Sequence, residues 1–393
     1  MKTAGFQTGI ETLLRVHRGW LRGRRVGLLS HQAALDGAGA SSAQRLRREL
    51  GAGLAALFGP EHGFLGQAGA GVETHTRRHP DWGIPVYSLY GSCRAPTPEM
   101  LRRVDLVVCD LQDLGARCYT YLASLANMLE ACAREGVAVI VADRPIPLPN
   151  VVDGPMLDPA CASFVAPVNV PLCTGMTPAE TARWIVVDRK LDLDLRVAPM
   201  RGWRRAGRRA ADWPDFVPPS PGIRTWESAQ TYLATVFSEA LPGIDVGRGT
   251  PLAFRLVGAP WLRAEPFCAH LRALRLPGVS FHPYRYVAGV APHAGVELDG
   301  IRLSVTDPDA FHPVAASISL LHALRQCHGT RRIWRHAGSR PEWFDKLYGT
   351  TATRLALAAA IAPRTIAASW RRAQRPFRER REKVLMYAGG TPD

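Results

Sequence analysis

Carboxylate side chains follow two apolar segments of this chain, at the point where each segment ends. Glu61 comes after residues 54–58, and Asp110 and Asp113 come after the mainly apolar residues 104–109. Carboxyl groups held in a cleft carry out acid–base chemistry, in which one group donates a proton and another accepts one. We interpret Glu61 as a catalytic acid whose pKa is raised by burial, and Asp110 and Asp113 as candidates for the second catalytic carboxylate.

Further polar side chains lie near the same segment ends and would line the same site. Tyr119 and Tyr121 can stack on a sugar ring, and Arg117 or Arg144 can bind a substrate carboxylate through two parallel hydrogen bonds. Aspartates at strand ends also cap turns and helices, and that alternative stays open for each residue taken alone. The residues predicted to bind substrate are His31, Gln32, His62, Glu73, Gln112, Arg117, Tyr119, Tyr121, Asp143 and Arg144, and the acidic members are further candidates for the second carboxylate.

Strands and helices are expected to alternate through the first 200 residues. Thr97 and Thr177 are followed by Pro at the first helical position, and Ser41 or Ser42 is a favoured N-cap. This alternation predicts βαβ units in a mainly parallel α/β sheet, whose carboxyl ends should all face one crevice. The expected strands are residues 25–30, 54–58, 84–89, 104–109, 137–142 and 193–200.

A second, smaller α+β domain is expected from residue 233. Residues 254–257 and 279–281 read as short strands, and residues 296–305 as a hairpin that turns on Asp299-Gly300. The basic residues 370–383 are interpreted as a solvated terminal helix. The predicted domains are therefore residues 1–232, which carry the catalytic groups, and residues 233–393, which close the cleft.

Composition and absent motifs narrow the function. The net charge of +15 comes from arginines scattered along the chain, and no base-reading motif is present, so no nucleic-acid partner is expected. The chain has no G-x-x-x-x-G-K-[ST] loop, no G-x-G-x-x-G turn, no G-x-S-x-G elbow and no recognised metal-ligand spacing, so no cofactor and no metal are expected. Acid–base work on a small-molecule substrate, such as hydrolysis of a glycosidic bond, fits best.

Cysteine usage and hydropathy indicate the compartment. The eight cysteines stand singly without a C-x-x-C pair, which is typical of a reducing environment. No run of 18 apolar residues and no signal-peptide core are present. We therefore expect a cytoplasmic protein that does not contact a membrane.

Eight ordered motifs spread over most of the chain resemble those of the exo-β-N-acetylmuramidase family, long known only as a domain of unknown function. They are FGPEHGF (58–64), GIPVYSLYG (83–91), PTPEML (96–101), D-x-Q-D-x-G-A-R-x-Y-T-Y (110–121), ADRP (142–145), GMT (175–177), VPPSP (217–221) and GRGT (247–250).

The resemblance implies a function and an architecture. It implies release of terminal N-acetylmuramic acid from the non-reducing ends of peptidoglycan fragments, a Rossmann-like N-terminal domain, and an active site in the cleft between two domains. It places the family glutamate on Glu61 and brings Arg248 into the cleft from the second domain. The residues implied to line the sugar pocket are Asp110, Gln112, Asp113, Arg117 and Tyr119.

The chain departs from the family pattern at three places. Val246 stands where a Glu usually precedes G-R-G-T, with Glu239 and Asp245 nearby; no acidic residue stands at Gly66-Gln67; and the loop at residues 31–34 reads HQAA. These departures keep open a second function from another class, a muropeptide-binding protein without catalytic activity. A nucleotide-dependent enzyme would need a phosphate-binding turn, which the chain lacks.

Overall fold

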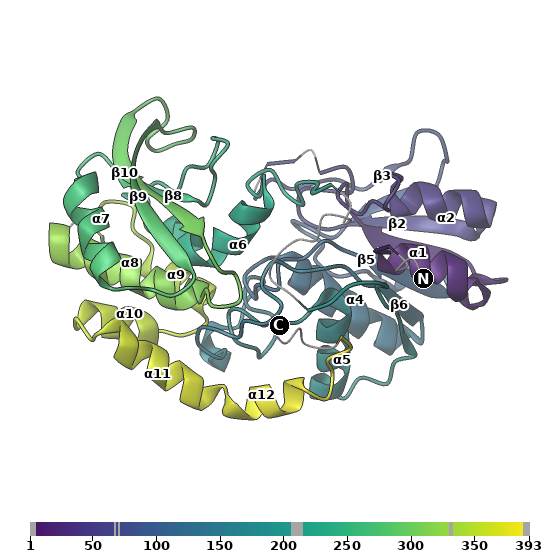
Figure 1. Cartoon of the computed structure of the whole chain (residues 1–393). Coiled ribbons are helices and arrows are strands. Elements are labelled where there is room, and N and C mark those ends of the chain that lie inside the picture. The colour runs from purple at the N-terminus through teal and green to yellow at the C-terminus, as the bar shows by residue number, and fades with distance from the viewer. Residues whose placement is uncertain (1–4, 67, 70, 206–214, 330–332, 388–393) are drawn as a thin grey trace.

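The chain folds into two parts that lie side by side (Figure 1). The computed structural model describes residues 5–66, 68–69, 71–205, 215–329 and 333–387. The N-terminal part contains a seven-stranded sheet, and the C-terminal part a smaller three-stranded sheet. No helix within these ranges is both long and apolar enough to cross a membrane.

The seven strands have the order β3-β4-β2-β1-β5-β6-β7, and all pairs are parallel except β3 with β4. Without the antiparallel β3, this is the strand order of a Rossmann fold, so the predicted fold class is confirmed. The strands are β1 (Val26–Ser30), β2 (Leu54–Gly59), β3 (Arg77–Arg78), β4 (Pro85–Ser88), β5 (Leu106–Asp110), β6 (Ala138–Ala142) and β7 (Leu195–Ala198).

Helices cover both faces of this sheet, because successive strand residues point to opposite sides. In β1, Leu28 packs with Ile10 of α1 and Leu46 of α2, whereas Leu29 belongs to the core that contains Leu125 of α4. The helices of this part are α1 (Gly9–Val16), α2 (Ser42–Leu50), α3 (Pro98–Leu101), α4 (Tyr121–Glu135) and α5 (Pro178–Arg189), with the 3-10 helices η1 (Arg18–Leu21), η2 (Gly51–Gly53) and η3 (Pro159–Cys161).

Helix starts follow the predicted caps. Ser41 and Thr177 each form a capping box with the residue three positions later, and Thr97 accepts a hydrogen bond from the main chain of Met100. These caps satisfy main-chain donors that a helix start otherwise leaves unpaired. In the N-terminal part, α1, the two-residue β3 and the three 3-10 helices were not predicted.

The C-terminal part builds an antiparallel sheet of order β8-β10-β9 with helices around it. Its strands are β8 (Leu256–Ala259), β9 (Val279–Val287) and β10 (Glu297–Val305), and its helices are α6 (Trp226–Thr235), η4 (Val236–Ala240), α7 (Ala264–Ala273), α8 (Pro313–His328), α9 (Pro341–Tyr348), α10 (Ala352–Ala358), α11 (Pro363–Ala373) and α12 (Arg375–Arg381). The predicted domain boundary at residue 232 lies inside α6, and the division at that residue stays a prediction.

The hairpin predicted at Asp299-Gly300 is wrong. Both residues lie inside β10, where Gly300 pairs with Tyr284 of β9 and Gly258 of β8. The glycine is needed there for close strand contact, since a Cβ on Gly300 would lie 2.5 Å from the Val257 carbonyl oxygen. The chain reverses instead between β9 and β10.

The basic C-terminal segment returns to the N-terminal part, as Figure 1 shows below α5. Arg381 of α12 is buried and donates to the main-chain oxygens of Pro149 and Gly175, at 3.1 and 2.6 Å. The Tyr387 hydroxyl donates to the Asp143 carboxylate at 2.6 Å. The segment is helical and most of its basic side chains are exposed, as predicted, but the prediction of a solvated position is wrong for Arg381.

Candidate active site

A cavity of about 690 Å³ lies between the two parts of the chain. This volume is within the usual range for small-molecule sites. We call it the interface cavity. Its polar and aromatic lining includes Glu61, His62, Tyr90, Arg94, Tyr119, Thr120 and Phe164 from the N-terminal part and Glu239, Asp245, Arg248, Arg340, Trp343 and Lys346 from the C-terminal part.

Glu61 enters the cavity from a tight turn at the end of β2. His62 and Gly63 both have positive φ, at 70° and 77°. This conformation is unusual for His62, which is not a glycine, and the two residues together reverse the chain directly after Glu61. Glu61 is 8% exposed, and its carboxylate accepts hydrogen bonds from the Thr120 hydroxyl at 2.6 Å and the Gly71 main-chain N–H at 2.9 Å. Glu61 is thus fixed in position while it still faces the cavity.

Two tyrosines lie on the same side of the cavity. Burial and the neighbouring Glu61 carboxylate raise the pKa of Tyr90 to about 12. The ring of Tyr119 lies between Tyr121 and Tyr232, with ring centroids 4.8 and 5.8 Å away, and its burial raises the pKa of its hydroxyl. Both hydroxyls therefore stay protonated and can donate hydrogen bonds at neutral pH.

Glu239 faces the cavity from the other side, at the end of η4. Its carboxylate lies 3.4 Å from the guanidinium of Arg248, and Arg340 donates to its main-chain oxygen. Burial and the negative charge of Glu61 raise the pKa of Glu239, although the two arginines act in the opposite direction. The sequence points to Glu239 only as an acidic residue near Val246, the position where the family pattern has a glutamate.

Asp110 and Arg144 form a buried pair instead of lining the interface cavity. Asp110 is 0% exposed and also accepts a hydrogen bond from the Ser42 hydroxyl. Arg144 binds the carboxylate through two nitrogens, with Nη2 at 3.0 Å. Because the two side chains bind each other in the interior, both residues have a structural role at the carboxyl end of β5.

His31, Gln32 and Gln112 complete this buried layer at the sheet edge. The Gln112 main-chain N–H donates to Nε2 of His31 at 2.9 Å, and burial and the nearby Arg144 charge lower the pKa of His31 to about 3. The side chain of Gln112 donates to the Pro145 carbonyl, and Gln32 donates to that of Pro218, at 2.8 and 2.9 Å. The loop that carries Pro218 thus covers this edge of the sheet.

Asp143 caps helix α5 rather than facing a cavity. It is 0% exposed and accepts hydrogen bonds from the Thr177 hydroxyl at 2.8 Å and the Ala179 main-chain N–H at 3.0 Å. Burial, with the nearby Glu180 charge, raises the pKa of Asp143 to about 7. Asp143 therefore has the helix-capping role that the sequence left open as an alternative.

Arg117 and Glu73 also lie away from the interface cavity. Arg117 is fully buried and donates to the main-chain oxygens of Pro155, Val170 and Tyr348. Glu73 is exposed and accepts hydrogen bonds from Ser92, which lower its pKa.

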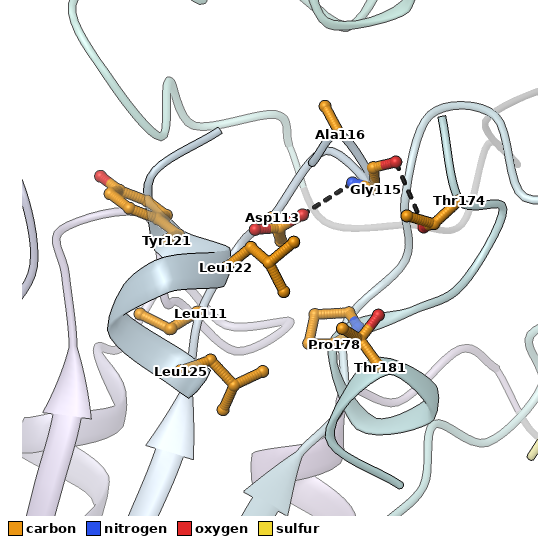
Figure 2. Close-up of a pocket in the computed structure, with 10 residues that line it drawn as sticks. All are labelled: Leu111, Asp113, Gly115, Ala116, Tyr121, Leu122, Leu125, Thr174, Pro178 and Thr181. Atoms are coloured by element: carbon orange, nitrogen blue, oxygen red, sulfur yellow. Dashed lines mark hydrogen bonds between the residues drawn. The ribbon is translucent and has the colours of Figure 1, made fainter. Parts of the chain in front are cut away.

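Asp113 and Tyr121 line a separate small cavity, shown in Figure 2. Its volume of about 10 Å³ holds at most one water molecule and cannot admit a sugar. Asp113 accepts a hydrogen bond from the Gly115 main-chain N–H at 2.7 Å, and burial raises its pKa to about 7.

The strand-end residues therefore do not converge on one crevice, and that expectation is wrong. Of the predicted site residues, Glu61, His62, Tyr119 and Arg248 line the interface cavity. The others bind neighbouring side chains or main-chain groups away from this cavity, line the small separate cavity, or, in the case of Glu73, lie exposed. Sequence reasoning missed Thr120, which lies within the 110–121 motif, and Arg340 and Lys346, which stand in no motif at all. Within the residues that the structure describes, no group of three His, Cys, Asp or Glu side chains is placed to hold a metal ion.

Comparison with known proteins identifies the family. Residues 26–227 match the family described as exo-beta-N-acetylmuramidase NamZ, N-terminal, and residues 230–387 match its C-terminal counterpart. The chain belongs to the exo-β-N-acetylmuramidase NamZ family. A NamZ relative from Bacillus subtilis (strain 168), the peptidoglycan beta-N-acetylmuramidase NamZ, is 37% identical over 97% of this chain and 91% of its own length.

Two crystal structures from Bacteroides fragilis NCTC 9343 share the fold of this NamZ-family chain. Both are of DUF1343 family proteins. One is 29% identical with a TM-score of 0.91 and covers 98% of this chain and 99% of its own. The other is 24% identical with a TM-score of 0.76, covers 98% and 100%, and supports the fold alone.

Proposed function

We propose that this protein is a glycoside hydrolase that releases terminal N-acetylmuramic acid from the non-reducing ends of peptidoglycan fragments. The observation that carries the proposal is Glu61, the glutamate of the P-E-H-G motif, held by two hydrogen bonds at the wall of the interface cavity. The family membership supports the reaction class, and the Bacillus relative carries the same activity in its name.

The charge of the interface cavity suits this substrate. N-acetylmuramic acid carries a lactyl carboxylate, and the cationic side chains that line the cavity can bind it. They are Arg94, Arg248, Arg340 and Lys346. The arginines first considered for this task, Arg117 and Arg144, are buried and occupied by main-chain oxygens and by Asp110.

Substitution of Glu61 tests the proposal. Glu61→Gln keeps the shape of the side chain and is expected to lower kcat/KM for a muramic-acid-terminated disaccharide by at least about 10²–10⁴-fold. Glu99→Gln, an equivalent change at a side chain 68% exposed on α3, serves as the control and should retain full activity. Thermal unfolding of both variants tests whether each of them still folds. Wild-type activity in a folded Glu61→Gln variant would remove Glu61 from the reaction.

A muropeptide-binding protein without catalysis is the second candidate. The observation in its favour is Val246, which lines the interface cavity where the family pattern has an acidic residue. The same disaccharide distinguishes the two functions, because calorimetric binding without released monosaccharide would indicate a binding protein. Gln67, part of another departure, lies outside the described residues.

We also propose a reducing cytoplasmic location. Eight free cysteines support it, six of them buried. A thiol titration of protein purified without reductant should then find all eight cysteines reduced.

A further inference from the structure

Two carboxylates reach the interface cavity from opposite parts of the chain. Glu61 comes from the turn after β2 and Glu239 from η4, and both line the cavity. Building on the proposed function, we infer that Glu239 is the catalytic residue that protonates the leaving oxygen and that Glu61 is the second catalytic carboxylate. This assigns a role to a residue of the C-terminal part and reverses the role expected for Glu61.

The surroundings of Glu61 hold its carboxylate in one orientation. The Thr120 hydroxyl and the Gly71 main-chain N–H donate to it, one to each oxygen. A carboxylate fixed in this way at a cavity wall is placed to accept a proton from water or to attack carbon.

The surroundings of Glu239 differ in the way that a general acid requires. The only charged group bonded to its carboxyl within the described part of the chain is Arg248, at the long distance of 3.4 Å, while Arg340 binds the main-chain oxygen instead. Burial and the negative charge of Glu61 both favour the protonated form. A carboxyl whose surroundings favour its protonated form is suited to donate a proton to a leaving oxygen.

The other candidate carboxylates either lie outside the interface cavity or hold neighbouring groups of the C-terminal part in place. Asp245 accepts hydrogen bonds from the Gly247 main-chain N–H at 2.6 Å and from the Tyr286 hydroxyl at 2.8 Å. Asp110 is paired with Arg144, and Asp113 lies in the small separate cavity. Glu239 is therefore the carboxyl left to act with Glu61.

The reaction balances with these two groups and one water. The bond between C1 and the leaving oxygen breaks, its electron pair stays on that oxygen, and the proton of Glu239 moves to it. If water attacks C1 directly, Glu61 takes the proton that the water loses. If Glu61 attacks C1, the ionised Glu239 takes the water proton in the second step and is reprotonated. In both routes Glu239 is the first proton donor.

Leaving-group dependence tests this assignment. Glu239→Gln is expected to lower kcat/KM for the disaccharide by about 10²–10⁴-fold, but for an aryl N-acetylmuraminide with a nitrophenolate leaving group by less than about tenfold, because that group departs without a proton. Glu61→Gln should lose activity on both substrates. Glu99→Gln is the matched control and should retain both activities.

The pH profile gives a second readout. The fall of kcat/KM at high pH, which reports loss of the acid's proton, should disappear for the aryl substrate in Glu239→Gln. Glu239→Asp keeps a proton donor, should recover part of the disaccharide activity, and covers the case in which the Gln variant does not fold. The charged and titratable groups that act on Glu239 or feel its charge are Glu61, Tyr90, Cys118, Tyr232, Arg248 and Arg340.

Different results overturn different claims. Equal loss on both substrates, or no loss on either, in a folded Glu239→Gln variant would overturn the assignment while leaving the glycosidase function intact. Wild-type protein that releases no sugar from either substrate would overturn the proposed function itself, and the assignment with it.

Discussion

The buried pair of Asp110 and Arg144 offers a sharp test of whether a polar residue at a strand end is structural or catalytic. Asp110→Asn removes the negative charge and keeps the side-chain shape. Arg144, whose side chain is 5% exposed, then keeps its positive charge in the interior without a counter-ion. Removing one partner of a buried ion pair costs about 3–5 kcal/mol.

The magnitude can be separated from ordinary mutational damage by a double-mutant cycle. Asp110→Asn should lower the free energy of unfolding by about 4 kcal/mol, measured by urea denaturation. The double variant Asp110→Asn/Arg144→Met removes both charges, so it should be less destabilised than Asp110→Asn and Arg144→Met together imply, with a coupling energy of up to about 3 kcal/mol. Asp188→Asn, which breaks a more exposed pair with Arg380, is the control and should cost about 1 kcal/mol or less.

Turnover completes the test. The folded fraction of Asp110→Asn should keep kcat/KM within about tenfold of wild type, because a catalytic base or acid contributes about 10²–10⁴-fold and Asp110 does not line the interface cavity. A variant that is as stable as wild type but inactive would refute the reasoning and return Asp110 to the catalytic groups.

Three further predictions follow from other buried or cavity-lining groups. His31 has a pKa of about 3 in the folded protein against an ordinary 6.5, so between these pH values the unfolded chain binds a proton that the native state does not. The contribution of neutral His31 to the free energy of unfolding is therefore complete above about pH 6.5 and should fall by about 1.4 kcal/mol per pH unit as the pH drops towards 3. His31→Gln should reduce this slope, measured by urea denaturation at several pH values. Arg117→Met should lower the free energy of unfolding by about 4 kcal/mol in the same assay, since three buried carbonyls lose a charged donor. A variant as stable as wild type but with a raised KM would instead support the prediction that Arg117 binds substrate. Arg340→Ala should raise KM about tenfold for a substrate with the lactyl carboxylate but not for its methyl ester, and the exposed Arg364→Ala should change neither KM; an equal effect on the KM of acid and ester would contradict anion recognition by Arg340.

The sequence by itself determined most of the secondary structure of the first half, and its fold class. Apolar segments of four to eight residues separated by capped helices can be satisfied only by a sheet covered on both faces, so the strands and the caps at Ser41, Thr97 and Thr177 were predictable. The motif around Glu61 also marked the cavity residue on which the proposed function rests. Local signals suffice here because caps and periodicity act over a few residues.

Sequence-based predictions were wrong where the same residue type serves in two different structural settings. Asp299-Gly300 is typical of a hairpin turn, yet Gly300 serves close strand contact inside β10, which depends on a neighbouring strand far away in the chain. The basic C-terminal residues were interpreted as solvated, yet Arg381 binds main-chain oxygens of the sheet-bearing part.

Only the tertiary structure decided which polar residues meet. Parallel strands bring their ends to one edge, but whether a side chain there faces solvent or a partner depends on what covers that edge. The Pro218 loop and the Asp110–Arg144 pair close the edge over β1 and β5, while the turn at His62 carries Glu61 past it to face Glu239 from the other part of the chain. A long-range encounter of this kind leaves no periodicity and no local spacing in the sequence, because it is set by how the two parts of the chain pack together.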